Sequence, residues 1–291
     1  MLPKIILLNN RSVLEISGSD RFNFLQGIIT NDINKIKNGN IIYSAMLNPQ
    51  GRFLYDFFIF EKDQKIFLDC LSFRCEELLK KMSFYKLRSD VVIVINQEIS
   101  VVLNFDQKNF KDPRFASKFT RSYIKKSEIQ NYQLEDESSY HIERYNNKIA
   151  EGEYDLFYDK SFILEYGFNN LNAVDFQKGC YVGQEVVART HYRGEIRKEV
   201  HKIFIENINQ QLKEYLITKN YIFDSKEFIT DNIFCLKGYE IIYQEKKIGI
   251  ILSSLVKNNC LNGLILLNYK DHNLKELENS LEIFNNKIKI T

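Results

Sequence analysis

The sequence has no apolar run long enough to cross a membrane. Its longest hydrophobic stretches, such as residues 91–95 and 248–252, have the length of β-strands, whereas a transmembrane helix needs about 20 apolar residues. The N-terminus leads directly into an apolar segment, with neither a secretory leader nor the arginines of a transit peptide. We therefore expect no membrane partner and a cytoplasmic location.

The sequence also lacks an excess of charge of either sign. Forty Lys and Arg residues oppose 38 Asp and Glu residues, so the formal net charge is +2. Domains that bind nucleic acid usually carry a strongly basic surface, so we expect no nucleic acid as a partner. Tryptophan is absent and only three prolines occur, a bias of composition that predicts no function.

Cysteine is scarce and its positions are scattered. Zinc sites and redox dithiols use closely spaced pairs such as Cys-x-x-Cys, and the sequence contains no such pair. We therefore expect no metal site built by this chain alone. The cysteines are Cys70, Cys75, Cys180, Cys235 and Cys260.

Apolar residues are plentiful enough for a large core. With 44% hydrophobic residues over 291 positions, the chain is expected to form two or three domains. The order of predicted strands and helices is typical of an α+β fold with helices packed on antiparallel sheets. Periodicity predicts hairpins of residues 5–8 with 13–16 and of residues 41–47 with 53–60, and a helix from Ser72.

The C-terminal part is expected to form a separate small β-barrel or sandwich, of which we favour the barrel. Short apolar segments at residues 239–244, 248–252 and 261–268 have the length and spacing of barrel strands. The polar stretch 207–219 is the best candidate for a boundary. We therefore predict a monomer with two regions, residues 1–206, which comprise two intertwined subdomains, and residues 207–291.

Residues 178–185 concentrate more reactive side chains than any other part of the chain. They read Lys-Gly-Cys-Tyr-Val-Gly-Gln-Glu, and the apolar residues that follow predict a helix that begins near Gly183. Cys180 would lie just before this helix, where free backbone amides and the charge of Lys178 would lower its thiol pKa below about 8.5. Such a thiolate attacks electrophiles or binds a soft metal; alternatively, Cys180 is apolar core filler.

A single acid interrupts the apolar strand 53–60. Both faces of this strand are apolar around Asp56, and a buried carboxylate needs a partner. The period of two places Asp56 on the same face as Arg52, so an ion pair with Arg52 or another cation is one explanation. The alternative is that Asp56 faces a cavity, where it forms a hydrogen bond with a bound cofactor or accepts a proton from it.

The segment 178–185 resembles the Lys-Gly-Cys-aromatic-x-Gly-Gln-Glu motif of the YgfZ-type folate-binding proteins, which help to assemble or insert iron-sulfur clusters. That family resembles the aminomethyltransferase T-protein of glycine cleavage. The resemblance therefore implies a T-protein-like multi-domain fold. Further similar segments are residues 24–27, 30–32, 48–52, 85–88 and 112–114.

The resemblance also implies a pocket for tetrahydrofolate or a one-carbon derivative of it. Asp56 stands at what looks like the position of the catalytic aspartate of the T-protein, and Cys180 with Lys178 would complete the reactive centre. The residues expected to bind the cofactor are Asp56, Arg52, Gln50, Asn31, Tyr181, Gln184 and Glu185.

Structural roles compete with these functional ones. Tyr181 would either stack on an aromatic ring or anchor its loop in the core. Gln184 and Glu185 would contact a substrate or cap the free amides of the helix. Asn31 belongs to a polar segment that either faces a ligand or caps a helical turn.

Three functions are compatible with these residues. The first is a folate-binding factor that assembles, inserts or repairs four-iron four-sulfur clusters in client enzymes, with client enzymes or cluster carriers as partners. The second is a folate-dependent aminomethyltransferase of the T-protein type, which leaves the cysteine segment unexplained. The third is an adaptor that catalyses nothing. A folate pocket serves sensing as well as chemistry, so the sequence favours the first but leaves open whether the protein is an enzyme.

Overall fold

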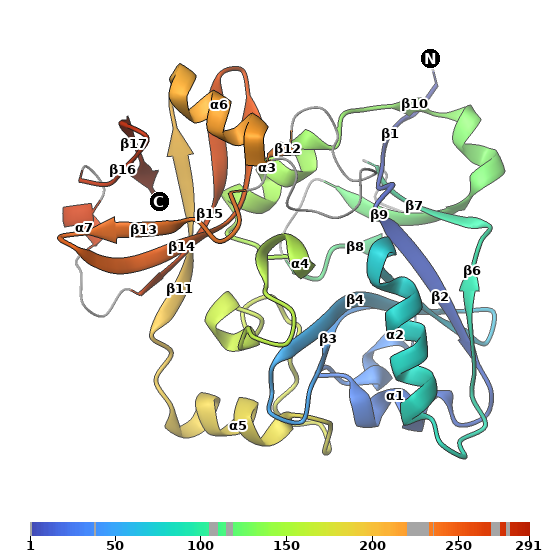
Figure 1. The fold of residues 1–291 in the computed structure, drawn as a ribbon. Helices are drawn as coiled ribbons and strands as arrows, with labels where there is room; N and C mark the ends of the chain where they lie inside the picture. Colours follow the sequence, from blue (N-terminus) through green and yellow to red (C-terminus); the bar gives the residue numbers. More distant parts are fainter. Residues whose placement is uncertain are drawn as a thin grey trace. The chain divides into compact units, whose positions relative to one another are not determined.

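The computed structural model of the chain describes residues 2–37, 39–104, 110–114, 119–219, 233–234, 236–268, 274–277 and 280–291 (Figure 1). Contacts between Cα atoms divide the chain into two compact units. Unit 1 comprises Met1–Glu137, Tyr158–Phe162 and Phe168–Tyr192, and unit 2 comprises Ser138–Phe157, Ile163–Gly167 and Arg193–Thr291.

Two sheets form the frame of unit 1. The first sheet has the strand order β3-β4-β5-β2-β6 and is antiparallel throughout; the second has the order β10-β1-β7-β9-β8 and includes one parallel pair, β1 with β10. The strands of the first sheet are β2 (Arg11–Ser17), β3 (Ile41–Leu47), β4 (Phe53–Lys62), β5 (Lys65–Leu71) and β6 (Val92–Asn96). Those of the second are β1 (Lys4–Leu7), β7 (Ile99–Asn104), β8 (Phe110–Lys111), β9 (Thr120–Lys125) and β10 (Gln133–Leu134).

Helices α1 and α2 cover one face of the first sheet (Figure 1). Apolar residues of α1 and α2 pack in one cluster with residues of β2, β4 and β5, since Cys75, Leu78 and Met82 recur at helical spacing on the buried face of α2. The opposite face of β4 packs on β9, where the rings of Phe60 and Tyr123 stack. The helices are α1 (Arg21–Ile28), α2 (Ser72–Tyr85), α5 (Gln184–Arg193) and the 3₁₀ segments η1 (Ile33–Ile36) and η2 (Lys126–Asn131).

The hairpin predicted for residues 41–47 and 53–60 is confirmed, whereas the one predicted for residues 5–8 and 13–16 is wrong. β3 pairs antiparallel with β4, and Gly51 takes a φ of +74° in the turn between them, a conformation that favours glycine. β1 and β2 instead lie in different sheets, β1 beside β7 and β10, and β2 beside β5 and β6. The alternation of apolar and polar residues predicts that a segment is a strand, but it does not predict which strand pairs with it when the partner lies far away in the sequence.

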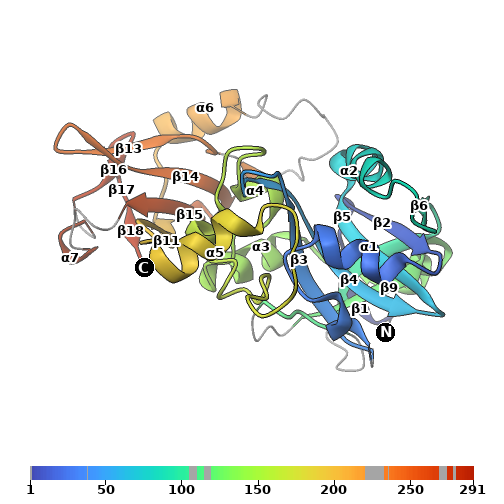
Figure 2. The same cartoon turned by 90° about the horizontal axis from the view of Figure 1, so that it is seen from below.

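Unit 2 is built around an antiparallel sheet with the order β12-β14-β15-β11-β18, to which β13 adds by pairing with β14. In Figure 2, β13, β14 and β15 lie side by side in orange and red. The strands are β11 (Lys198–Ile205), β12 (Ile233–Phe234), β13 (Glu240–Tyr243), β14 (Lys246–Lys257), β15 (Cys260–Asn268) and β18 (Lys289–Ile290), with β16 (Glu282–Ile283) and β17 (Asn286–Lys287) paired separately. The helices are α3 (Ser138–Asn146), α4 (Gly152–Asp155), η3 (Ile163–Tyr166), α6 (Gln210–Lys219) and α7 (Leu274–Leu277).

The predicted α+β class with antiparallel sheets is confirmed. The predicted boundary between residues 206 and 207 falls inside unit 2, between β11 and α6, and the division into residues 1–206 and 207–291 stays a prediction. Among the residues that the structure describes, no helix is long and apolar enough to span a bilayer.

Candidate functional site

Cys180 lies exposed on the loop that precedes α5. The helix starts at Gln184, close to the predicted start at Gly183. The residues on either side of Cys180 differ from it, because Lys178 and Tyr181 are each only 8% exposed. The thiol is therefore presented to solvent between two buried side chains, and the alternative that Cys180 is core filler is wrong.

Lys178 ties this loop to the end of α1. Its Nζ atom donates hydrogen bonds of 2.8, 2.6 and 2.9 Å to the backbone carbonyls of Gln26, Ile29 and Asn31. Carbonyls at a helix C-terminus lack helical partners and attract cations. An ammonium has three hydrogens to donate, so the three carbonyls occupy all of them. Burial lowers the pKa of Lys178 to about 8, and its predicted catalytic role stays a prediction.

Asp175 holds the beginning of the same loop. Its carboxylate accepts hydrogen bonds from the backbone amides of Gln177 and Lys178 at 2.7 and 3.0 Å and forms an ion pair with Lys35 at 2.8 Å. Partial burial acts to raise the pKa of Asp175, but the contacts with Lys35 and the two amides outweigh it and the pKa is lowered. The loop before Cys180 is thus fixed through backbone and side chain.

The β3–β4 turn packs against the loop on the other side of Cys180. A Cβ atom placed on Gly183, whose φ is +84°, would lie 2.5 Å from the carbonyl oxygen of Asn48 and 3.0 Å from Cβ of Leu47. A Cβ atom on Gly51 would lie 2.8 Å from Cβ of Val186 in α5. The two glycines therefore allow two backbones to approach each other, whereas a Cβ atom on Gly179 would meet nothing within 4 Å.

Asn31 is a buried junction rather than an exposed ligand group. Its side-chain amide donates to the carbonyls of Tyr43 and Asn172 at 2.8 and 2.7 Å, so both amide hydrogens are used. Its carbonyl accepts from Lys178. Asn31 therefore joins β3 to the Cys180 loop, and its expected contact with folate stays a prediction.

Asp56 is buried in β4, with 3% of its surface exposed. Its Oδ2 atom accepts a 2.6 Å hydrogen bond from the hydroxyl group of Tyr43 on the neighbouring strand β3. The expected ion pair with Arg52 is wrong, whereas a pair with another cation stays a prediction. The guanidinium of Arg52 donates instead to the carbonyl of Lys160 at 2.8 Å and lies 4.7 Å from the ring centroid of Phe162.

Tyr43 was not predicted as a site residue, and it connects Asp56 to the Cys180 loop. Its hydroxyl group reaches Asp56, and its carbonyl accepts from Asn31, which in turn accepts from Lys178. The predicted pairing of β3 with β4 could have identified Tyr43, because residues on the neighbouring strand are the first candidates for partners of a buried acid.

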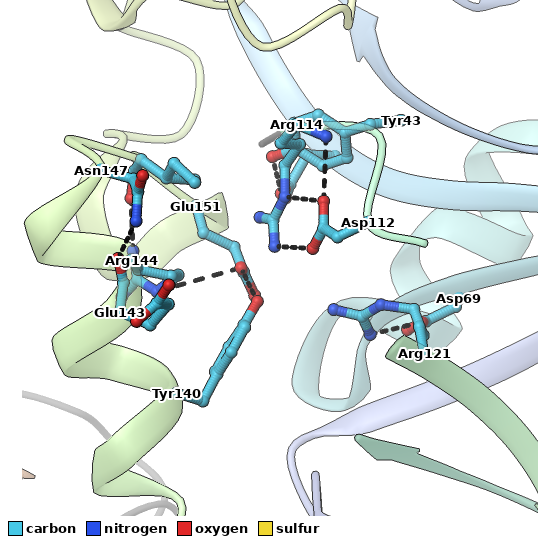
Figure 3. Close-up of polar contacts among 12 residues, drawn as sticks. Tyr43, Asp69, Asp112, Arg114, Arg121, Tyr140, Glu143, Arg144, Asn147 and Glu151 are labelled. Atoms are coloured by element: carbon cyan, nitrogen blue, oxygen red, sulfur yellow. Dashed lines mark hydrogen bonds and ion pairs between the residues drawn. The ribbon is translucent and has the colours of Figure 1, made fainter. Parts of the chain in front are cut away.

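Two arginines lie over aromatic rings of β3 and β4. Figure 3 shows Arg114 with Asp112 and Tyr43, and Arg121 with Asp69. Arg114 lies 5.0 Å from the ring centroid of Tyr43 and is held by Asp112 through hydrogen bonds of 2.9 and 2.7 Å. Arg121 lies 3.8 Å from the ring centroid of Phe58. Cationic groups over aromatic faces are attractive contacts, so this side of β4 combines an acid, aromatic rings and positive charge.

Asp69 neutralises part of that positive charge. Its carboxylate, which is fully buried, accepts hydrogen bonds from Arg11 at 2.6 Å, from Arg121 at 2.8 Å and from the hydroxyl group of Tyr123 at 3.0 Å. Burial and the Asp69 carboxylate raise the pKa of Tyr123, which keeps its hydroxyl group a donor. This network links β2, β5 and β9 and is structural.

Unit 2 has a buried ion cluster of its own, also drawn in Figure 3. Arg144 of α3 is fully buried and donates to Asp155 at 2.8 Å and to the carbonyl of Ile149 at 2.7 Å. Tyr140 donates to Glu151 at 2.5 Å. The sequence did not predict this cluster, because its members follow no periodic pattern.

The remaining predicted site residues lie in the Cys180 loop, in the β3–β4 turn and in the first turn of α5. Tyr181 is buried, with the ammonium of Lys178 5.0 Å from its ring centroid, which is the anchoring alternative. Gln50 is exposed at the tip of the β3–β4 turn, and Glu185 is exposed in the first turn of α5. Gln184 is half-buried there. Neither Gln184 nor Glu185 forms a side-chain hydrogen bond with any described residue, so their roles toward a ligand stay predictions.

Metal-binding groups do not gather in the described parts of the two units. No cluster of three or more His, Cys, Asp or Glu side chains there could hold a metal ion. Cys235, one of the five cysteines, lies outside the described residues.

Comparison with known proteins shows what the chain is similar to in sequence and in fold. Residues 8–96 match the model of the GCVT N-terminal domain. In structure, the chain is similar to the glycine cleavage system aminomethyltransferase T from Bartonella henselae, with a TM-score of 0.68 over 99% of this chain and 84% of that one, at 9% sequence identity. The chain has a T-protein-like fold. At this identity the likeness concerns the fold alone.

In sequence, the chain is similar to mitochondrial iron-sulfur cluster assembly factors. It is 31% identical to the IBA57 homolog of Mycosarcoma maydis over 68% of this chain and 56% of that protein. It is 33% identical to the homolog of Pyricularia oryzae over 66% and 55%, and 30% identical to the IBA57 protein of Mus musculus over 68% and 65%. The match thus spans less than two thirds of each relative's length.

These relatives correct one prediction and leave another open. The cytoplasmic location is contradicted, because the similar assembly factors are mitochondrial proteins. The sequence rule behind it was weak, since it depended only on the few residues at the N-terminus. The matches support a T-protein-like protein related to cluster assembly factors, but they do not single out the YgfZ type, which stays a prediction.

Proposed function

We propose that the chain is a mitochondrial-type iron-sulfur cluster assembly factor that binds tetrahydrofolate or a one-carbon derivative. It serves the assembly, insertion or repair of four-iron four-sulfur clusters in client enzymes, and client enzymes or cluster carriers are its partners. The observation that carries the proposal is the exposed thiol of Cys180 on a loop fixed by Lys178 and Gly183. The similarity to cluster assembly factors supports the same function.

A fixed, exposed thiol suits transient contact with an iron-sulfur cargo. Thiolate is the soft ligand that iron-sulfur clusters take in proteins. A resident cluster needs several ligands, whereas a single thiol can contribute to a cluster only together with groups from a partner. Because Asp175, Lys178 and Gly183 fix the loop on both sides of Cys180, the sulfur is held ready for such a partner.

The residues around Asp56 fit a reduced folate. Asp56 accepts a hydrogen bond from Tyr43, and its carboxylate would be the acceptor for N–H groups of a pterin ring. The ring centroid of Tyr43 lies 5.0 Å from that of Phe58 and 5.5 Å from that of Phe168. Bound folate would supply one-carbon chemistry; the chain's own residues would orient it.

A cluster-transfer assay tests the role of Cys180. The full chain is mixed with an apo client enzyme and a cluster carrier, and recovery of client activity is followed for the wild type and for Cys180→Ser. We expect the variant to lose most of the stimulation. Cys260→Ser, at a half-buried position in unit 2, is the matched control and should behave as the wild type. Equal stimulation by wild type and Cys180→Ser would refute the role of this thiol.

Calorimetry with tetrahydrofolate tests the folate site separately. Asp56→Ala should weaken binding about tenfold or more, because a charged hydrogen-bond partner is lost. Tyr43→Phe removes only the neighbouring hydroxyl group and should have a smaller effect. Equal affinity in wild type and Asp56→Ala would remove Asp56 from the site.

An assay with an aminomethylated lipoyl carrier separates the aminomethyltransferase alternative. We expect no formation of methylene-tetrahydrofolate, because the cysteine segment has no place in that reaction. A rate comparable to that of a T-protein would favour the transferase over the assembly factor.

A further inference from the structure

A cavity lies in unit 1, and Asp56 is not among the residues that line it. Its volume is about 530 Å³, and residues from the start of β3, the end of β4, β8 and β9 line it. β3 and β8 are edge strands of the two sheets, so the cavity occupies the open side between the sheets. Phe60, which lines it, is four positions along β4 from Asp56, a distance of about 13 Å in a strand.

Aromatic rings form one wall of this cavity. The ring of Phe60 is fixed between Phe67 and Tyr123, which stack on it with centroid distances of 5.2 and 4.1 Å. Phe110 packs against Phe60 at 5.0 Å. Phe110 and Tyr123 are half-buried, and the hydrogen bond from Tyr123 to Asp69 holds the orientation of its ring. A planar ligand would meet rings that are already in place.

Positive charge forms the rim. Lys62 ends β4 and Lys111 ends β8, and both side chains are exposed. Neither lysine side chain forms an ion pair or hydrogen bond with any residue in the described part of the chain. None of the described residues that line the cavity is acidic. Two lysines without acidic partners attract an anion.

We propose that this cavity binds a mononucleotide-sized heteroaromatic phosphate, with its ring on Phe110 and Tyr123 and its phosphate between Lys62 and Lys111. The volume lies in the range of about 300–1,000 Å³ that is typical of small-molecule sites. A phosphate ion alone would leave the rings unused, and an apolar ligand would leave the lysines unused. The site is separate from the folate site of the proposed function and does not depend on it.

Fluorescence titration of the full chain with ethenoadenosine monophosphate tests the site. We expect saturable binding that weakens as salt increases, because screening reduces the attraction of the lysines. The double variant Lys62→Glu/Lys111→Glu should bind about tenfold more weakly or worse. Lys80→Glu, an exposed lysine of α2 on the other face of the first sheet, carries the same charge change and should bind as the wild type.

Variants of the Phe110 ring, and competing ligands that have only the ring or only the phosphate, complete the test. Phe110→Leu should weaken probe binding about tenfold by loss of stacking, while Phe110→Tyr keeps the ring and should preserve it. Adenosine and inorganic phosphate should each compete more weakly than AMP. No saturation below about 1 mM probe, or equal binding by the double lysine variant and the wild type, would overturn the proposal. Probe binding that Asp56→Ala weakens and the lysine variants do not would place the probe in the folate site and would also overturn it.

Discussion

The Nζ atom of Lys178 lies 2.6 Å from the carbonyl oxygen of Ile29, the residue that caps the C-terminus of α1. The two residues are 149 positions apart in the chain. This contact, with those to Gln26 and Asn31, makes the end of an N-terminal helix the support for the loop that carries Cys180. The lysine of the reactive segment therefore acts as an anchor whatever chemistry the thiol performs.

Replacing this anchor should destabilise unit 1. Lys178→Met leaves three carbonyls without their donor, and we expect a loss of about 1–3 kcal/mol in the free energy of unfolding. Urea denaturation measures it. Lys65→Met is the control, because Lys65 forms only an exposed ion pair with Glu15, worth about 0–1 kcal/mol. Equal stability of Lys178→Met and wild type would show that the three hydrogen bonds contribute little.

The stability contributed by Lys178 should depend on pH. Burial lowers the pKa of its ammonium from 10.5 to about 8 in the folded chain. Between these values the unfolded chain binds more protons at this residue than the folded chain, so the free energy of unfolding should rise with pH and level off on either side. Urea denaturation at about pH 7 and about pH 10 measures the rise, which Lys178→Met should lack. A wild-type stability that falls relative to the variant over this interval would contradict the assigned direction.

The close approach at Gly183 should be sensitive to a single methyl group. Gly183→Ala places Cβ 2.5 Å from the carbonyl oxygen of Asn48 at a φ of +84°, so we expect a loss of about 1–3 kcal/mol. Gly179→Ala in the same segment is the matched control, because its Cβ would meet no atom within 4 Å. Thermal unfolding of both variants decides, and a similar effect of both would argue against the packing of the β3–β4 turn on this loop.

Cys180 should be the first of the described cysteines to react with iodoacetamide. It is exposed, whereas Cys70 and Cys75 are buried and Cys260 is half-buried, and a thiol must be accessible to be alkylated. Mass spectrometry after brief treatment near neutral pH gives the order of modification. Modification of Cys70 or Cys75 before Cys180 in the folded protein would contradict the exposed position of the loop.

The ion network around Asp69 should be essential for folding. Asp69→Asn removes the negative charge that two buried arginines, Arg11 and Arg121, share, and breaking a buried network in this way costs about 3–5 kcal/mol. Glu15→Gln, which affects an exposed pair with Lys65, is the control and should change stability by less than about 1 kcal/mol. Urea denaturation of the two variants provides the comparison.

Some elements could be predicted because their signals are local. The β3–β4 hairpin follows from alternating apolar residues on either side of a turn that contains Gly51, and α2 follows from the spacing of Cys75, Leu78 and Met82. The reactive segment was recognisable from its composition alone. By contrast, β1 and β2 have equally clear patterns, yet they pair with strands from distant parts of the sequence.

The sequence by itself determined which side chains are candidates for chemistry, because residue type and short-range spacing single out the thiol of Cys180 and the acid of Asp56. Only the tertiary structure decided what surrounds them. In the tertiary structure, Lys178 binds carbonyls at the end of α1, Asp56 accepts a hydrogen bond from Tyr43 while Arg52 binds elsewhere, and two lysines lie beside a cavity lined with aromatic rings. Such partners are selected by burial and hydrogen bonding between segments far apart in the chain, so a local sequence pattern does not predict them.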